Sequence, residues 1–294
     1  MVAVVACLKK NRGDVYVGES DGEDILEGKV AIITGGASGF GESTVRLFAK
    51  HGANVLIADV QDDRGNSICA DFVSAPSEVI YVRCDVTKEA DVKNVLDTAV
   101  SKFGKVDIVF SNAGILGNPD FSILEFDREN VKRILDVNVF GSFLVAKHAA
   151  RVMIPVKSGA IIFTSSMASV LSGEAPYSYL VSKHAVVGLM KNLCVELGQH
   201  GIRVNCISPS TIATPMLTNA TGLDKSVIDE IICASSILKG VVPAVEDVAE
   251  AALYLGSGES KFVSGVNLVV DGGYSTTNQE YLKLFGQKLE ALRQ

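Results

Sequence analysis

The chain has 294 residues, enough for one large α/β domain or two small ones. Its hydrophobic content of 48%, with 21% charged residues and a formal net charge of −7, is typical of a globular protein whose sheet is buried on both sides. The acidic balance argues against a surface for nucleic acid or anionic membranes, and the apolar stretches are too short to span a bilayer.

The first 27 residues are predicted to form a polar N-terminal extension. MVAVVACLKK places an apolar patch before its basic residues, the reverse of a secretory signal, and ESDGEDILE (19–27) is too acidic for an organelle transit peptide. The six cysteines include no CxxC pair, which favours reduced thiols over disulfides or a zinc site. We therefore predict a cytoplasmic protein with no metal site.

From residue 28 onward, short β-branched runs alternate with helical patterns. Seven strands are predicted, at 29–34, 53–59, 78–86, 106–114, 159–166, 201–209 and 263–273. They are apolar throughout rather than alternating, which is typical of a parallel sheet covered on both faces. The repetition predicts an α/β, Rossmann-like doubly wound fold with a seven-stranded, mostly parallel sheet and helices on both faces. No break in composition interrupts 28–274, so we predict one domain there.

The segment TGGASGFG (34–41) lies between a strand and a helix, where backbone amides can approach a phosphate. A plain tight turn would also use these glycines, whereas a P-loop would need a lysine where Glu42 stands. A dinucleotide site predicts an acidic residue at the end of the next strand, and Asp59 stands there. Its carboxylate would accept hydrogen bonds from the ribose hydroxyls of the cofactor and would repel a 2′-phosphate. No Arg or Lys between Gly35 and Gly41 offsets that repulsion, so the sequence favours NAD over NADP.

The segment YSYLVSK (177–183) holds two tyrosines and a lysine. On a helix, Tyr179 and Lys183 share one face because they are four residues apart, whereas Tyr177 lies most of a half-turn away. Such pairs are common by chance, so the spacing nominates Tyr179 without establishing any chemistry.

Two segments depart from the strand–helix rhythm. Residues 215–243 form a long insertion after the sixth strand, at the end of the sheet where ligands bind in this fold, so we predict a substrate lid. Residues 275–294 are predicted to form a C-terminal helical tail, packed on its own subunit or clasping another.

Taken in order, these motifs resemble the short-chain dehydrogenase/reductase family from about residue 28 to 274. The resemblance rests on TGGASGFG (34–41), Asp59, CDV (84–86), NAG (112–114), Asn138, Ser166, the Tyr179–Lys183 pair and VVDGG (269–273). Eight motifs in the family's order are far more specific than any one of them. The resemblance also selects Tyr179, because Ser166 lies thirteen residues before it, as the family's serine does.

The resemblance implies a catalytic set of Asn138, Ser166, Tyr179 and Lys183. A phenol with a pKa near 10 is a weak base at neutral pH, and a nearby lysine ammonium, together with the positive charge of the oxidised nicotinamide, would lower that pKa. Tyr179 would then take the proton of a substrate hydroxyl, Ser166 would orient the substrate oxygen, and Asn138 would hold a water linking Lys183 to solvent.

The resemblance also implies the residues that bind the cofactor. We expect them to be Gly35, Ser38, Gly39, Phe40, Gly41, Asp59, Asp85, Val86, Asn112, Ala113, Gly114, Tyr179, Lys183, Ile212 and Thr214. The sequence departs from the commonest family pattern at Ser210, where most members have glycine, and this departure narrows the pocket floor near the nicotinamide contact.

This departure and the segment 182–210 bring the chain nearest to plant NAD-dependent secondary-alcohol dehydrogenases of the secoisolariciresinol, borneol and isopiperitenol dehydrogenase type. The resemblance implies oxidation of a secondary or allylic alcohol of a hydrophobic terpenoid or phenylpropanoid to a ketone, aldehyde or lactone, by a homotetramer. One alternative stays open, a cyclase or isomerase of monoterpene (iridoid) metabolism that uses bound NAD as a scaffold without net hydride transfer.

Overall fold

The computed structural model describes residues 25–118, 121–277, 285 and 287. Most of the predicted N-terminal extension and most of the C-terminal tail lie outside these ranges. Leu26, which the sequence interpretation assigns to the extension, is fully buried against the sheet, and its backbone N–H donates to the His51 carbonyl. The folded domain therefore begins before residue 28.

A single seven-stranded sheet organises the described part of the chain, with the strand order β3-β2-β1-β4-β5-β6-β7. The strands are β1 (Val30–Thr34), β2 (Asn54–Asp59), β3 (Val79–Arg83), β4 (Ile108–Ser111), β5 (Gly159–Thr164), β6 (Ile202–Pro209) and β7 (Asn267–Val270). All six pairings are parallel, which confirms the predicted doubly wound Rossmann-like fold. The order reverses between β1 and β4, and such a switch point opens a crevice at the carboxyl ends of the strands.

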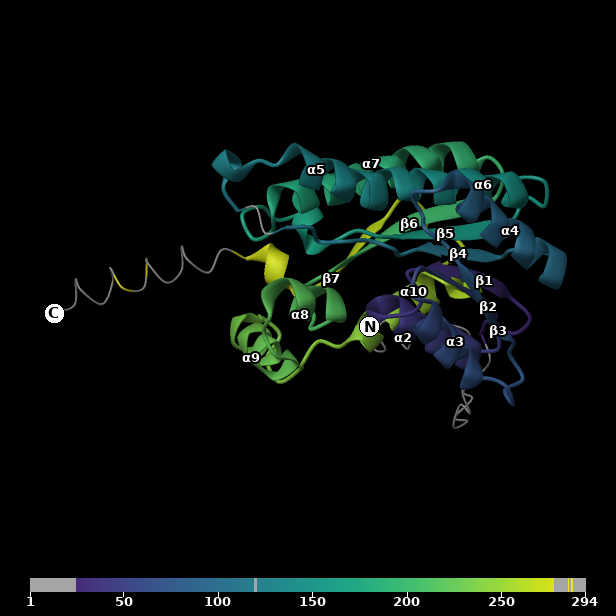
Figure 1. Cartoon of the computed structure of the whole chain (residues 1–294), viewed down its shortest axis with the longest axis horizontal. Coiled ribbons are helices and arrows are strands. Elements are labelled where there is room, and N and C mark those ends of the chain that lie inside the picture. The colour runs from purple at the N-terminus through teal and green to yellow at the C-terminus, as the bar shows by residue number, and fades with distance from the viewer. Residues whose placement is uncertain (1–24, 119–120, 278–284, 286, 288–294) are drawn as a thin grey trace, which may run out of the picture.

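Helices cover both faces of this sheet (Figure 1). The helices α4 (Glu89–Phe103), α5 (Arg128–Leu135), α6 (Gly141–Met153) and α7 (Tyr177–Gly198) lie on one side, and α2 (Gly39–Lys50), α3 (Asp62–Ala70) and α10 (Val245–Gly256) on the other. Each layer closes its own apolar core against the strands. In α4, for example, Val92, Val95, Leu96 and Ala99 are buried at helical spacing. No helix in the described ranges is long and apolar enough to cross a membrane.

Three elements differ in detail from the sequence predictions. A π-helical turn, η2 (Asp136–Phe140), separates α5 from α6, and the alternation of strand and helix patterns gave no sign of it. Such turns occur frequently at functional sites, and this one carries Asn138. The strand β7 is shorter than the predicted 263–273. The insertion 215–243 contains two helices, α8 (Pro215–Thr221) and α9 (Lys225–Ser235), which lie beside the end of the sheet (Figure 1).

Candidate active site

The glycine-rich turn lies between β1 and α2, and two of its glycines leave no room for a side chain. Gly35 has a φ of 64°, and a Cβ there would lie 2.9 Å from the Cα of Ala113. A Cβ on Gly41 would lie 2.0 Å from the Gly35 carbonyl oxygen. The turn, the start of α2 and the chain after β4 therefore touch through their backbones, which leaves amides close to the crevice.

Asp59 ends β2 beside this turn and is 5% exposed. Its Oδ2 accepts from the backbone N–H of Ala37 at 3.0 Å, and its Oδ1 accepts from the backbone N–H of Gln61 at 3.0 Å. The side-chain amide of Gln61 donates to the same Oδ1 at 3.2 Å. These bonds hold the carboxylate in a fixed position at the edge of the crevice.

The fold also brings Arg64 to the turn, a residue that sequence reasoning missed because it considered cations only within 35–41. The Arg64 Nε donates to the Ala37 carbonyl at 3.0 Å, and a terminal nitrogen lies 3.4 Å from Glu42. The same Glu42 carboxylate pairs with Arg46 at 3.0 Å. The Arg64 guanidinium thus lies near Asp59, and the Glu42 carboxylate beside it partly neutralises its positive charge.

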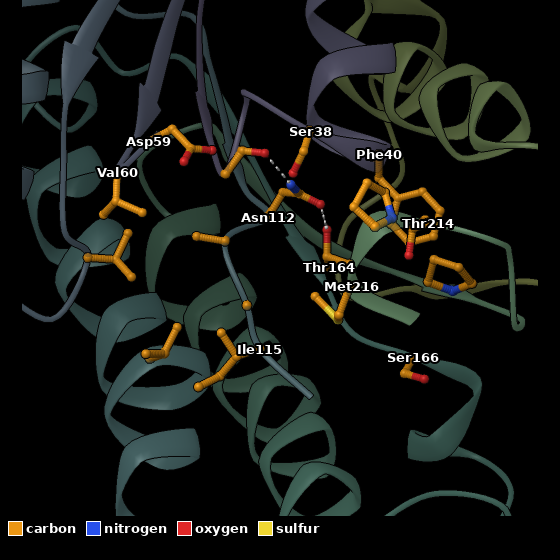
Figure 2. Close-up of a pocket in the computed structure, with 18 of the residues that line it drawn as sticks. Ser38, Phe40, Asp59, Val60, Asn112, Ile115, Thr164, Ser166, Thr214 and Met216 are labelled. Atoms are coloured by element: carbon orange, nitrogen blue, oxygen red, sulfur yellow. Dashed lines mark hydrogen bonds between the residues drawn. The ribbon is translucent and has the colours of Figure 1, made fainter. Parts of the chain in front are cut away.

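Asn112 joins the ends of three strands at the floor of the crevice. Its side-chain amide donates to the backbone carbonyls of Thr34 and Gly35 at 3.1 and 3.3 Å, and its Oδ1 accepts from the Thr164 hydroxyl at 2.9 Å. Figure 2 shows Asn112 between Asp59 on one side and Thr164 on the other. This residue fixes the crevice floor through three strands that are distant in the sequence.

A groove of about 470 Å³ follows these strand ends. Figure 2 shows Asp59 and Val60 at one end and Ser166, Thr214 and Met216 toward the other. Most residues predicted to bind the cofactor line it, namely Gly35, Ser38, Gly39, Phe40, Asp59, Asp85, Val86, Asn112, Ala113, Gly114, Tyr179, Lys183 and Thr214. Gly41 packs against the turn instead, and Ile212 lines a neighbouring cavity.

Further residues line the groove that the sequence motifs did not single out. They are Val60, Gln61, Ile115, Val137, Thr164, Ser165, Pro209, Pro215 and Met216, beside Cys84 of the CDV motif and Ser210, which the sequence did single out. Several directly follow a strand or adjoin a motif, so the rule that ligands bind beyond strand ends would have found them. Val137 gave no such signal, since it reaches the groove from a helical segment.

Ser166, Tyr179 and Lys183 meet at the far end of the groove. Ser166 follows β5, and its hydroxyl is hydrogen-bonded to the Tyr179 phenol. Tyr179 and Lys183 lie on one face of α7, and the Lys183 Nζ is 5.4 Å from the centre of the tyrosine ring. Tyr177, by contrast, is largely exposed and lines neither cavity described in this region.

In the polypeptide alone, without the charge of a bound nicotinamide, the pKa of Tyr179 is raised. Burial raises that pKa, and the hydrogen bond from Ser166 opposes the rise without cancelling it. Lys183 is 4% exposed, and burial lowers its pKa to about 8, so part of its charge is lost in the mildly alkaline range. At neutral pH most of the Lys183 charge remains, but in the polypeptide alone it does not offset the effect of burial on the phenol.

Asn138 and Lys183 both lie beside the backbone at Gly114. A Cβ there would be 3.3 Å from the Asn138 Oδ1 and 3.5 Å from the Lys183 Nζ. The Asn138 amide exchanges two hydrogen bonds with the backbone of Ile115, at 2.8 and 2.9 Å, and donates to the Ser182 hydroxyl at 3.0 Å. The Lys183 Nζ donates to the Thr164 carbonyl at 2.8 Å. Asn138 thus anchors the chain after β4 to α7.

The lowered pKa of Lys183 predicts a pH-dependent stability. Between about pH 8 and the ordinary lysine pKa of 10.5, the unfolded chain binds more protons at this position than the folded chain. The free energy of unfolding attributable to Lys183 should therefore rise across that window, by about 3 kcal/mol. We expect chemical denaturation to show this gain for the wild type relative to Lys183→Met, with no cofactor added. A difference that does not change with pH would contradict it.

A second cavity, of about 220 Å³, adjoins the groove at this end. The two share Phe40, Ser166, Tyr179, Ser210, Thr214 and Met216, so they are continuous. The second cavity is lined mainly by apolar and hydroxyl side chains from the segments after β4, β5 and β6 and from α8. The site therefore consists of a long groove for an extended ligand, joined at Tyr179 to a smaller, mostly apolar cavity.

Comparisons with known proteins agree with this geometry. A family model described as enoyl-(acyl carrier protein) reductase matches residues 35–275. The chain is 56% identical to short chain aldehyde dehydrogenase 1 of Euphorbia lathyris, over 87% of this chain and 91% of the relative. It is 55% identical to the mitochondrial borneol dehydrogenase of Lavandula x intermedia, over 86% and 93%. Among solved structures, levodione reductase matches with a TM-score of 0.80 and 30% identity, covering 86% of this chain and 100% of that one.

Proposed function

The chain belongs to the short-chain dehydrogenase/reductase family, and from that premise we propose that it oxidises a hydrophobic alcohol with NAD+ as the acceptor. The substrate is a secondary or allylic alcohol of a terpenoid or phenylpropanoid, and the product is a ketone, aldehyde or lactone. One observation carries the proposal. The groove from Asp59 reaches the Ser166–Tyr179–Lys183 cluster, where an apolar cavity opens.

The groove has the features that a dinucleotide requires. Backbone amides of the glycine turn, at the start of α2, suit a pyrophosphate. Asp59 has lone pairs beyond those bound by Ala37 and Gln61, and these can accept hydrogen bonds from ribose hydroxyls. Asp85 and Val86 line the wall where an adenine would lie. Asn112, Ala113 and Gly114 form the floor, and Thr214 and Lys183 stand at the nicotinamide end, with Ile212 behind Thr214.

Bound NAD+ supplies a hydride acceptor for the carbinol carbon and a positive charge beside the phenol. Tyr179 then acts as general base and takes the hydroxyl proton, with a lowered pKa once that charge adds to Lys183. Ser166 donates to the substrate oxygen and fixes its direction toward Tyr179. Asn138 bonds both to the chain at Ile115 and to Ser182 on α7, and so holds Gly114 and Lys183 in a fixed position relative to each other.

The insertion 215–243 is the proposed substrate lid. Met216 and Leu217 of α8 line the apolar cavity, so α8 contributes directly to the surface that a substrate would contact. Exclusion of water by such a lid favours hydride transfer over side reactions.

We further propose a homotetramer in the cytoplasm. Phe140, Phe143, Val181 and Val195, on η2, α6 and α7, are exposed apolar side chains that subunit contacts would cover. The cysteines in the described ranges are free thiols, as a reducing compartment allows. Both proposals can be examined by light scattering and by localisation of a tagged chain.

The experiment that tests the function is a substrate screen. Purified protein is incubated with NAD+ and a panel of monoterpene, phenylpropanoid and steroid alcohols, and products are followed by mass as well as by NADH absorbance. NADH formed in step with an oxidised product supports the proposal. A rearranged product without net NADH would replace it with the cyclase or isomerase function.

The cofactor preference is tested at Asp59. We expect Asp59→Asn to raise the ratio of kcat/KM with NADP+ to that with NAD+ by about tenfold or more, because the carboxylate no longer repels a 2′-phosphate and Arg64 is close. Asparagine keeps the size of the side chain, which limits disturbance of the bonds to Ala37 and Gln61. The matched control is Asp62→Asn, which removes a nearby exposed carboxylate outside the groove. An unchanged ratio in Asp59→Asn, or an equal change in the control, would refute the assignment.

A further inference from the structure

Glu174 is a solvent-exposed residue at the edge of the apolar cavity beside Tyr179. The described residues that line this cavity include hydrophobic side chains and neutral hydroxyls, and Glu174 is their single charged member. It lies just before α7, on the segment that leads to Tyr179. A carboxylate is therefore part of the surface that the distal part of a substrate would contact.

The carboxylate is held by a residue from far along the chain. The phenol of Tyr274, in η5 (Tyr274–Thr276), donates to the Glu174 Oε1 at 2.8 Å. This hydrogen bond raises the pKa of Tyr274, so its phenol stays protonated and keeps donating around neutral pH. An ionised carboxyl has about four acceptor positions, and Tyr274 takes one of them. The group can still accept hydrogen bonds from a ligand.

A carboxylate in such a surface discriminates between ligands. A purely hydrocarbon group pressed against Glu174 would remove its water without replacing the lost hydrogen bonds, which is unfavourable. A hydroxyl at the same position would replace that water and bond to a charged acceptor, one of the stronger hydrogen bonds in proteins. The cavity thus favours a ligand that has an apolar skeleton and a hydrogen-bond donor where it meets Glu174.

One molecule can reach both Tyr179 and Glu174. Ser166 and Tyr179 line it together with Glu174. Glu174 and Tyr179 are five residues apart, so their Cα atoms cannot be separated by more than about 17 Å. A carbinol at Tyr179 and a second hydroxyl at Glu174 therefore fit on one carbon skeleton.

We propose that Glu174 is a specificity-determining residue that selects alcohols carrying a second hydroxyl group, remote from the carbinol that is oxidised. Tyr274 is the residue that positions its carboxylate. The substrate class is then a diol, or a polyol with an apolar skeleton, rather than a simple mono-alcohol. This inference rests on the proposed function, because it concerns the substrate of that reaction. Its test by binding does not require turnover.

The test uses two matched pairs of probes of different length. They are 1,4-benzenedimethanol with 4-methylbenzyl alcohol, and 5α-androstane-3,17-diol with 5α-androstan-17-ol. Dissociation constants are measured by calorimetry on the full chain with NADH present, and kcat/KM is measured with NAD+. We expect the wild type to prefer at least one diol over its mono-alcohol by about tenfold, and Glu174→Ala to lose that preference by weakening the diol alone.

Two further variants separate selection from a merely structural contact. Tyr274→Phe removes the bond to Glu174 but keeps the carboxylate, so the diol preference should survive in part. Glu250→Ala, on α10 and outside both the cavity and the lid, removes an equal charge and should change nothing. Equal binding of both members of each pair by the wild type would overturn the inference, as would equal weakening of both by Glu174→Ala. If the diol preference is present but no alcohol yields NADH, the inference stands and the proposed oxidation fails.

Discussion

Replacement of Tyr179 by phenylalanine is expected to lower kcat/KM for alcohol oxidation by roughly a thousandfold, the usual contribution of a well-placed general base. The phenol is hydrogen-bonded to Ser166 at the point where the groove joins the apolar cavity, which is the position that the proposed base would occupy. The dissociation constant for NAD+ should change less than twofold. Steady-state kinetics and calorimetry measure the two quantities separately.

The control for this variant is Tyr177→Phe. Tyr177 belongs to the same helix, two residues earlier, but it is largely exposed and lies outside both cavities. The activity of Tyr177→Phe should equal that of the wild type. Turnover by Tyr179→Phe at the wild-type rate would show that another group is the base. Because burial raises the pKa of Tyr179, we also expect the oxidation rate of the wild type to increase with pH above neutrality.

Gly41→Ala is expected to have the largest effect on stability. The new Cβ would lie 2.0 Å from the Gly35 carbonyl oxygen and 2.8 Å from the Asn112 side-chain nitrogen, and backbone atoms cannot move aside as a side chain can. We expect the free energy of unfolding to fall by at least about 3 kcal/mol. The affinity for NAD+ should also fall, because the turn that presents its amides must shift. Chemical denaturation at equal protein concentration and calorimetry with NAD+ test both results.

Gly198→Ala is the matched control for that substitution. Gly198 ends α7 and does not adopt a positive φ, and a Cβ added there would meet no atom of another element within 4 Å. Alanine there should leave stability unchanged or increase it by up to about 1 kcal/mol. If Gly41→Ala and Gly198→Ala were equally stable, the close backbone contacts of Gly41 would not be the reason that glycine is needed there.

Much of the fold could be predicted from the sequence because its signals are local. Apolar strands such as 159–166 alternate with helical patterns, and this alternation alone predicts a parallel sheet with two helical layers. The glycine turn and Asp59 similarly predict a crevice, since both must follow strands at the same edge. The π-helical turn at Asn138 could not be predicted, because its hydrogen bonds to Ile115 and Ser182 join segments that periodicity does not relate.

The sequence by itself determined the fold class, because alternating strands and helices are a local pattern, and helical spacing placed Tyr179 and Lys183 on one face. The resemblance of its ordered motifs to a known family then added Ser166 and Asn138. Only the tertiary structure decided their electrostatic setting. It brought Arg64 to the turn beside Asp59, buried Tyr179 and Lys183 so that the pKa of the phenol is raised and that of the ammonium is lowered, and joined Glu174 to Tyr274 across one hundred residues. Charge and desolvation depend on neighbours in space, and no local pattern encodes those neighbours.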